Sequence, residues 1–301
     1  MGVDGGGTKT TAWVVDQSGK RVGEGRAGGS NYQTNPEAFA EIQRAVSQAC
    51  EAAKIDSHQL THTCFGLAGA DRSEDITQIT TNLQEKHSST FHVVCDTEIA
   101  LQAGSATGKG IVIVCGTAVN AFAVDSFHEL HYLGGHGYAF GDYGGGLELS
   151  TEVFRTVIRA WDKREKPTLL TALVLEQLGY DSVEAMYEAC IRYPKTVPKD
   201  LAPLLFIAEE QGDEAASQIL HWQADEFVKT VRVLIDAGEY RPPDQQIILA
   251  GSLLTKSSTK ALRRLIREKL MKEGIDFRVL PLVDEPVSGA VQMAMNYKPM
   301  K

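Results

Sequence analysis

The sequence has few of the features that mark membrane, nucleic-acid-binding or secreted proteins. No apolar run approaches the roughly 20 residues that cross a bilayer, and no cationic stretch followed by an apolar run opens the chain. The net charge is −9, and no run of lysine and arginine reverses it locally. A basic nucleic-acid surface is therefore excluded, and we expect a cytoplasmic protein without a nucleic-acid or membrane partner.

Cysteine is also scarce, and its placement argues against both a disulfide-stabilised domain and a zinc-stabilised domain. The five cysteines are odd in number and none forms a CxxC pair. A free cysteine in an apolar run behaves as a small hydrophobic residue. The pattern predicts a reducing compartment, without a disulfide framework or a structural zinc site. The five are Cys50, Cys64, Cys95, Cys115 and Cys190.

What is present is an ordinary globular composition with 43% hydrophobic and 23% charged residues. The length of 301 residues exceeds what one small core needs, so we expect two domains.

The chain contains an internal repeat. Residues 3–16 read VDGGGTKTTAWVVD and residues 112–125 read VIVCGTAVNAFAVD, and several positions coincide at an offset of about 109 residues. Each segment is an apolar run, a Gly-Thr turn, a second apolar run and an aspartate. This predicts two β-hairpins with backbone N–H groups at their tips, facing each other across a cleft. A chance similarity of two Gly-Thr turns is the alternative.

Strands alternate with helices along the rest of the chain, which predicts α/β layers. Thr63–Leu67 and Phe91–Cys95 read as buried strands, and Asn35-Pro36 reads as the start of an amphipathic helix. We place a domain boundary in the turn-like segment GSATGKG. The predicted domains are residues 1–108 and residues 109–301, the second with a helical insertion and a last helix that could pack back on the first.

The loop DGGGTKT (Asp4–Thr10) is the strongest local signal for phosphate binding. Three successive glycines let the backbone approach phosphate oxygens closely, and Thr8 adds a hydroxyl donor. Asp4, at the end of a buried strand, is placed to hold Mg²⁺ through water. A tight hairpin is the alternative, but a hairpin needs fewer glycines.

Asp96 follows a predicted strand and precedes a predicted helix. A carboxylate at the carboxyl end of a strand lies where ligands bind in open α/β sheets, and it could accept a proton from a sugar hydroxyl that attacks the γ-phosphate of ATP. A helix N-cap explains the same residue equally well. Local sequence leaves the two interpretations open.

Several glycine-rich turns are further candidates for ligand contacts. Residues 134–146 form one glycine-dense loop that suggests a backbone shaped around a ligand, in which Asp142 could bind vicinal hydroxyls. Asn31 and the segment Ala68–Asp71 are candidates for sugar contacts or simple turns. By contrast, the GxGxxG pattern at Gly23–Gly28 leads into an extended segment rather than a helix, so we reject a dinucleotide fingerprint.

Four motifs together resemble the N-acetylglucosamine kinase branch of the BadF/BadG-type ATPase family, within the actin, hexokinase and heat-shock ATPase superfold. The resemblance covers nearly the whole chain and implies two ribonuclease H-like lobes flanking a cleft. It also implies ATP-dependent phosphorylation of an amino sugar, at the 6-hydroxyl of N-acetylglucosamine or N-acetylmuramic acid. The motifs are DGGGTKT, GLAGADRSED (Gly66–Asp75), DTEIAL (Asp96–Leu101) and GGHGYAFGDYGGG (Gly134–Gly146).

Carried over residue by residue, the resemblance implies a general base, a sugar site, an ATP site and a Mg²⁺ site, with a homodimer left open. Asp96 is the implied base and Asp4 the implied metal residue. The implied sugar contacts are Asn31, Gly69, Asn120 and Asp142. The implied ATP contacts are Gly6, Gly7, Thr8, Lys9, Gly116, Thr117, Gly251 and Ser252.

The sequence departs from the family at four positions in these motifs. Ala118 and Val119 stand where the family has Gly-Ser in the second phosphate loop, and a β-carbon at 118 is expected either to restrict a turn that needs a positive φ or to crowd a phosphate. His136 replaces a tryptophan, and Tyr143 replaces the glutamate of GDEGS. Two rival interpretations follow from other classes: a non-catalytic sugar sensor, and an ATPase activator of a radical dehydratase that would need cysteines for an iron–sulfur cluster.

Overall fold

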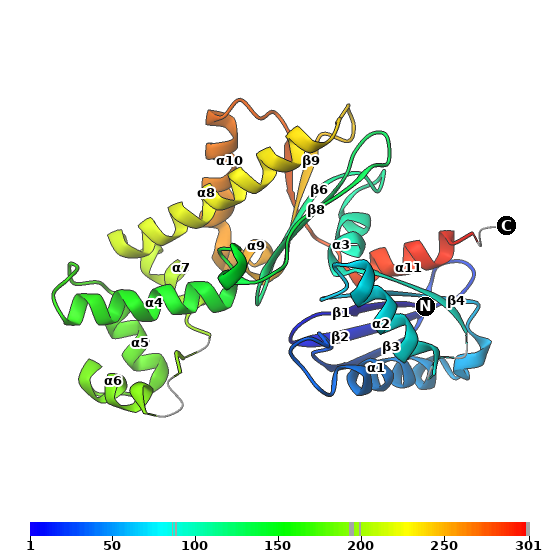
Figure 1. Ribbon diagram of the computed structural model, residues 1–301, viewed down its shortest axis with the longest axis horizontal. Coiled ribbons are helices and arrows are strands. Elements are labelled where there is room, and N and C mark those ends of the chain that lie inside the picture. The colour runs from blue at the N-terminus through cyan, green and yellow to red at the C-terminus, as the bar shows by residue number, and fades with distance from the viewer. Residues whose placement is uncertain (86, 88, 193–195, 199, 299–301) are drawn as a thin grey trace.

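Two five-stranded sheets form the two lobes of this computed structural model, which describes residues 1–85, 87, 89–192, 196–198 and 200–298 (Figure 1). The strand order is β3-β2-β1-β4-β5 in the first sheet and β8-β7-β6-β9-β10 in the second. In both sheets the first three strands are antiparallel and the last two join in parallel. The predicted α/β class with two lobes of ribonuclease H type is confirmed.

The strands have these bounds. The first sheet contains β1 (Gly2–Gly5), β2 (Lys9–Val15), β3 (Arg21–Gly28), β4 (His62–Leu67) and β5 (Thr90–Cys95). The second contains β6 (Gly110–Cys115), β7 (Val119–Val124), β8 (Leu130–Gly134), β9 (Gln246–Ala250) and β10 (Arg278–Pro281). The predicted division after residue 108 lies between the two sets.

The internal repeat predicted from the sequence extends to hydrogen bonding. Asp16 accepts hydrogen bonds from the amides two and four residues further along the chain, at 2.9 and 3.1 Å. Asp125 does the same in the second lobe, at 2.8 and 2.9 Å. The same aspartate turn therefore follows the first hairpin of each lobe, which supports duplication over chance similarity.

Helices pack on the first sheet through small and apolar side chains. Helix α1 (Ala38–Ala53) buries Ile42, Ala45, Val46 and Ala49 against it. The helix begins at Ala38, two residues after the predicted Pro36, although the Asn35 side chain accepts a hydrogen bond from the Glu37 amide at 2.9 Å, as an N-cap does. Helix α2 (Ser73–Gln84) follows β4, and helix α3 (Asp96–Gly104) follows β5 directly.

The rejected GxGxxG pattern lies on strand β3, where its glycines have a packing role. A β-carbon on Gly23 would lie 2.1 Å from the carbonyl oxygen of Ala49, and one on Gly25 would lie 2.0 Å from that of Ala45. Only glycine allows α1 to approach β3 this closely.

The second lobe carries the helical insertion. Residues from β6, β7 and β9 share one hydrophobic core with α4, α5, α7, α8 and α10. The second lobe contains helices α4 (Gly146–Trp161), α5 (Leu170–Leu178), α6 (Val183–Ile191), α7 (Ala202–Glu210), α8 (Glu214–Ala237), α9 (Ser252–Thr255) and α10 (Lys260–Lys272). Among the described residues, the 3₁₀ turns are η1 (Ser57–Gln59) in the first lobe and η2 (Tyr138–Phe140) and η3 (Ser257–Thr259) in the second.

The last helix, α11 (Val287–Asn296), lies on the first lobe beside α3 (Figure 1). Ala290 packs in one cluster with Cys64 of β4 and Ile99 of α3. A β-carbon on Gly289 would lie 2.0 Å from the Ile99 carbonyl oxygen, so the backbones of α11 and α3 are in direct contact. Within the described ranges, no helix combines the length and apolarity needed to cross a membrane.

Candidate functional site

The tips of the two repeated hairpins lie against each other between the lobes. The Gly6 amide donates to the Lys9 carbonyl at 2.9 Å, and the Gly116 amide donates to the Ala118 carbonyl at 3.0 Å. A β-carbon on Gly7 would lie only 3.7 Å from Thr117 Oγ1 of the other tip. Glycine and threonine backbone from both lobes therefore meets at one place, with Thr8 exposed there.

The second turn tolerates the alanine that departs from the family pattern. The described non-glycine residues with positive φ are Lys54, His128, Lys163 and Asp200, and Ala118 is not among them. The expectation that Ala118 would strain a turn of positive φ is wrong, because this turn does not need that conformation.

The start of α4 holds the second turn in place. The amides of Gly146 and Leu147 donate to the carbonyl oxygens of Gly116 and Thr117, at 2.8 and 3.2 Å. A β-carbon on Gly145 would lie 2.6 Å from the Ala118 Cα. The glycines that end the glycine-rich loop therefore serve as close packing under the second turn.

Asp96 is the first residue of α3 and is half-buried. Cys95 is the N-cap of this helix, and Glu98 completes a capping box, since its Oε1 accepts a hydrogen bond from the Cys95 amide at 3.0 Å. Burial raises the pKa of Asp96 to about 6, and the Asp71 carboxylate adds to the rise, while a hydrogen bond from the Cys95 thiol opposes it. A carboxylate with this pKa is suited to accept a proton near neutral pH.

Asp4, at the end of β1, is also half-buried and lies among other carboxylates. Burial raises the pKa of Asp4 to about 7, with further contributions from Asp96 and Glu285, while Lys9 lowers it. This excess of negative charge fits a bound cation. The described part of the chain has no cluster of three or more histidine, cysteine or acidic side chains arranged for a metal, so an ion at Asp4 would need water and phosphate as its other ligands.

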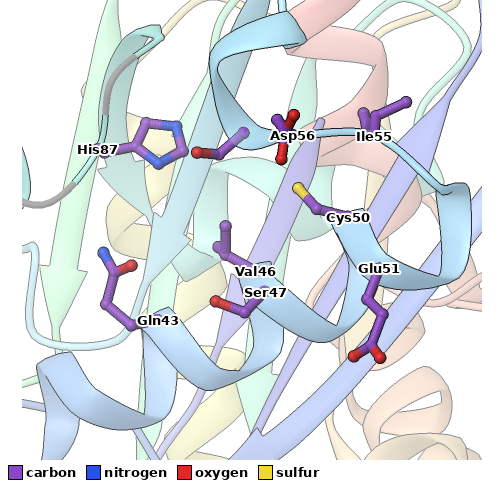
Figure 2. A pocket seen from close by; sticks show the side chains of 9 residues that line it. Gln43, Val46, Ser47, Cys50, Glu51, Ile55, Asp56 and His87 are labelled. Carbon is purple, nitrogen blue, oxygen red and sulfur yellow. The ribbon is translucent and has the colours of Figure 1, made fainter.

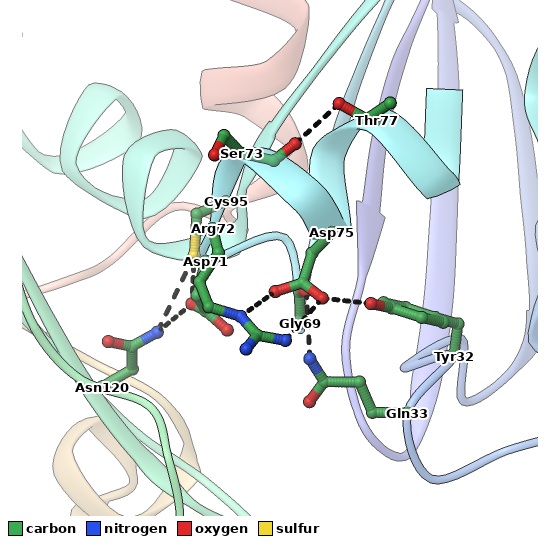
Figure 3. A network of polar contacts seen from close by, with 10 residues as sticks. All are labelled: Tyr32, Gln33, Gly69, Asp71, Arg72, Ser73, Asp75, Thr77, Cys95 and Asn120. Carbon is green, nitrogen blue, oxygen red and sulfur yellow. Dashed lines mark hydrogen bonds and ion pairs between the residues drawn. The ribbon is translucent and has the colours of Figure 1, made fainter. Parts of the chain in front are cut away.

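The structure brings two predicted sugar contacts of the first lobe together. Asn31 Oδ1 accepts a hydrogen bond from the Gln33 amide at 3.0 Å, and it lies 3.0 Å from the place of a β-carbon on Gly69. Gly69 has a φ of 86°, which favours glycine. The Gln33 side chain donates to the Gly69 carbonyl at 3.4 Å (Figure 3).

The two predicted sugar contacts of the second lobe lie beside the glycine-rich loop. A β-carbon on Gly135 would lie 2.7 Å from Asn120 Nδ2, and one on Gly134 would lie 3.0 Å from Asp142 Oδ1. Asp142 Oδ2 accepts hydrogen bonds from the amides of His136 and Gly137, both at 2.6 Å. One carboxylate oxygen of Asp142 therefore closes its own loop, and the other faces Gly134.

The predicted nucleotide-side turn lies against the second phosphate turn. Gly251 ends β9 and has a φ of 86°, and a β-carbon there would lie 2.3 Å from the Cys115 carbonyl oxygen at the end of β6. Ser252 is the first residue of α9. The charged neighbours of Tyr143 are Glu152 and Arg155 of α4 and Glu226 of α8.

Two contacts between the lobes were not predicted from the sequence. Asn120 Nδ2 donates to Asp71 Oδ1 at 2.7 Å, and Tyr132 Oη donates to Glu98 Oε1 at 3.2 Å. Asp71 lies in the motif GLAGADRSED, so the motif could have identified Asp71 as a site residue. No local sequence feature identifies Tyr132.

A cavity of about 450 Å³ lies away from all these residues (Figure 2). It is bounded by α1, the segment that follows α1, and His87. It contains none of the predicted site residues.

Comparison with known proteins places this chain among ATPases and sugar kinases. The BadF/BadG/BcrA/BcrD ATPase family matches residues 1–294. The N-acetyl-D-glucosamine kinase of Dictyostelium discoideum is 28% identical, over 99% of this chain and 98% of its own. The N-acetylmuramic acid/N-acetylglucosamine kinase of Clostridium acetobutylicum is 26% identical, over 84% of this chain and 85% of its own.

Solved structures of low sequence identity share the fold. A structure from Chromobacterium violaceum, described as a candidate N-acetylglucosamine kinase, has a TM-score of 0.77 and 22% identity over 97% of both chains. A ROK family glucokinase from Streptomyces griseus, solved with glucose and AMPPNP, has a TM-score of 0.60 and 17% identity over 97% of both chains.

Proposed function

Because the chain belongs to the BadF/BadG/BcrA/BcrD ATPase family, we propose that it is a cytoplasmic enzyme that transfers a phosphoryl group from ATP to an amino sugar. The observation that carries the proposal is the proximity of two Gly-Thr tips from two lobes, since a β-carbon on Gly7 would lie 3.7 Å from Thr117 Oγ1. Such tips present backbone N–H groups to phosphate. The substrate class follows from the names of the relatives in Dictyostelium discoideum and Clostridium acetobutylicum.

Asp96 is the proposed general base. Asp96 is not the N-cap of α3, because Cys95 holds that position and Glu98 completes the capping box. The Asp96 carboxylate still accepts hydrogen bonds from the amides of Asp96 and Thr97, which lower its pKa. Its pKa of about 6 leaves most of the carboxylate ionised at neutral pH while keeping it basic enough to accept the proton of a sugar hydroxyl. The deprotonating oxygen then attacks the γ-phosphorus in line with the leaving ADP.

The tips hold the ATP phosphates and Asp4 holds the metal in this proposal. The phosphate contacts come from Gly6, Gly7, Thr8, Lys9, Gly116 and Thr117, and the nucleotide side from Gly251 and Ser252. A Mg²⁺ ion at Asp4 would neutralise charge on the β- and γ-phosphates. The acidic surroundings that raise the pKa of Asp4 support a cation there.

The acceptor is proposed to be the 6-hydroxyl of N-acetylglucosamine or N-acetylmuramic acid. Asn31, Gly69, Asn120 and Asp142 are its proposed contacts. Their placement supports this, since Asn120 and Asp142 lie beside consecutive glycines of one loop, and Asn31 lies beside Gly69.

The activator of a radical dehydratase receives no support from the cysteines. Cys50, Cys64, Cys95 and Cys115 are buried, and Cys190 is partly buried. A cluster shared across a dimer surface needs thiolates at that surface, and burial raises the pKa of all five thiols.

The test is ATP consumption and sugar-phosphate formation with glucosamine, N-acetylglucosamine, N-acetylmannosamine, N-acetylmuramic acid and glucose. We expect a 6-phosphate from one N-acetylated sugar, and a loss of about 10²–10⁴-fold in kcat for Asp96→Asn. A variant with near-normal turnover removes Asp96 as the base. Binding of ATP and sugar without product from any sugar favours the sensor.

A further inference from the structure

Asp71 joins the two lobes beside the proposed base (Figure 3). It lies in the loop after β4 and is half-buried. Its Oδ1 accepts a hydrogen bond from Asn120 Nδ2 of the second lobe at 2.7 Å, and another from Cys95 Sγ at 3.1 Å. One carboxylate oxygen therefore links a proposed sugar contact with the residue that precedes Asp96.

The amide of Asn120 is held at both of its ends. Its oxygen accepts a hydrogen bond from the Ala121 amide at 2.8 Å, and its nitrogen donates to Asp71. The backbone of Gly135 packs against the same amide, where a β-carbon would lie 2.7 Å from Nδ2. An amide nitrogen carries two hydrogens: Asn120 donates one to Asp71 at 2.7 Å and directs the other at Cys95 Sγ at 3.8 Å. A sugar contact of Asn120 would replace this long bond to sulfur, and Asp71 sets the direction of the amide.

The thiol of Cys95 lies between two carboxylates. Its Sγ is 3.1 Å from Asp71 Oδ1 and 3.3 Å from Asp96 Oδ1. Burial raises the pKa of Cys95 well above its usual value, and the two aspartates raise it further, so the thiol keeps its proton. Because a thiol has a single hydrogen, it donates to one carboxylate at a time, and Asp71 competes with Asp96 for it.

We propose that Asp71 is a positioning residue of the acceptor site. Its carboxylate orients the Asn120 amide of the second lobe, and it shares the hydrogen of the Cys95 thiol with Asp96. One side chain therefore links the two lobes and also affects the hydrogen bonding of the proposed base. The proposal rests on the proposed sugar kinase function.

Three ionisable groups face Asp96: Asp4 of β1, Asp71 and Cys95 of β5. Lys9 and Glu285 in turn lie near Asp4. The negative charge of Asp71 raises the pKa of Asp96. Removing that charge while keeping the shape should therefore let Asp96 ionise at lower pH.

The kinetic test compares Asp71→Asn and Asp71→Ala with Glu74→Gln, an exposed carboxylate of the same segment. For Asp71→Asn we expect the acid limb of kcat/KM to move down by about half a pH unit to one unit. For Asp71→Ala we expect the KM for the sugar to rise about tenfold or more, with the KM for ATP unchanged. Profiles that match Glu74→Gln overturn the proposal, as does an equal rise of both KM values.

A second test does not depend on turnover. In a double-mutant cycle of Asp71→Ala and Asn120→Ala, we expect the double variant to lose less Tm than the two single losses together, because the second change removes a partner that is already gone. Additive losses overturn the link, whether or not the wild-type protein phosphorylates sugar. A non-additive cycle with an inactive wild-type protein keeps the link and removes the kinase function.

Discussion

Asp4 and Asp96 place negative charge where the fold opposes it. Burial is the largest cause that raises both pKa values, to about 7 for Asp4 and about 6 for Asp96, and Asp96 raises that of Asp4 further. A carboxyl group with a raised pKa in the folded state binds more protons than in the unfolded chain. The two side chains therefore lower the stability of the free protein near neutral pH, which is a common cost of a reactive site.

Asp96→Asn should make the protein more stable at high pH. The folded pKa of about 6 exceeds the unfolded value of about 3.9, so the free energy of unfolding falls as the pH rises through the window from about 4 to 6. Above that window the wild-type chain carries a penalty of about 3 kcal/mol that asparagine avoids. We expect a Tm higher by several degrees at pH 8 and nearly equal at pH 4, measured without ATP and Mg²⁺.

Glu74→Gln is the control for this prediction, because Glu74 is exposed at the start of α2. Its Tm should follow the wild-type value at both pH values. An Asp96→Asn protein that is less stable than wild type at pH 8 would show that ionised Asp96 supports the fold rather than opposing it.

At the residue scale, the sequence predicts where a site residue lies on its own strand or helix better than it predicts hydrogen bonds between the lobes. Asp96 was indicated by its place after a strand, although a helix N-cap explained it equally well. The structure makes its neighbour Cys95 the N-cap, with Glu98 completing the capping box. The bonds from Asn120 to Asp71 and from Tyr132 to Glu98 join different lobes. They depend on how the two sheets are placed, which periodicity and spacing do not encode.

The two hairpins are the element on which the proposed ATP site depends, and they are not identical. Gly5 pairs with Thr10 in the first, whereas Cys115 pairs with Val119 in the second, so the second turn has one residue fewer. The turn closes on Ala118 without a positive φ and is held from behind by α4. Alanine therefore stands in this turn without backbone strain.

Gly116→Ala separates ligand binding from folding. A β-carbon at Gly116 would meet nothing within 4 Å, and the residue is outside the region of positive φ. We expect the Tm of the free protein to be unchanged or raised by the equivalent of about 0.4–1 kcal/mol. If phosphate binds at this tip, the KM for ATP should rise about tenfold while the KM for the sugar stays constant.

Ala118→Gly is the matching change in the same turn, since it removes a β-carbon instead of adding one. Its KM for ATP should equal or fall below the wild-type value. An unchanged KM for ATP in Gly116→Ala would place the phosphates away from the second tip.

Most elements were predictable, but the reasons for individual glycines were not. The hairpins, β4, β5 and β9 follow from apolar runs bounded by turn residues. The glycines of β3 looked like part of a loop motif, whereas they make room for α1. Close packing of two backbones leaves the same sequence signature as a phosphate loop, and only the neighbouring element distinguishes them.

On the scale of the whole molecule, the two lobes share one sheet topology, and the C-terminal helix α11 packs back on the first lobe. The strand orders of the two lobes coincide, and the repeat in residues 3–16 and 112–125 was enough to predict this duplication from the sequence. The return of α11 to the first lobe depends on Gly289 and on Gly2 of β1, where a β-carbon would lie 2.4 Å from the Val291 nitrogen. The C-terminal helix thus packs against α3, the helix that begins with Asp96.

Gly289→Ala should therefore disturb both stability and catalysis. The new β-carbon would lie 2.0 Å from the Ile99 carbonyl oxygen and 2.8 Å from the Ala103 nitrogen, and these are backbone atoms of α3 that cannot rotate away. Overpacking of this kind costs about 1–3 kcal/mol, or about 2–4 °C of Tm for each kcal/mol. We expect a lower kcat for sugar as well, because a shift of α3 moves Asp96.

The matched control is Ser288→Ala, one position earlier on the same helix. Ser288 Oγ is buried without a hydrogen-bond partner among the described residues, so its removal should leave the Tm equal or slightly higher. Thermal unfolding and sugar phosphorylation of both variants decide the point. If Gly289→Ala loses Tm but keeps kcat, α11 stabilises the first lobe without positioning the base; if it loses neither, α11 and α3 are not in backbone contact in solution.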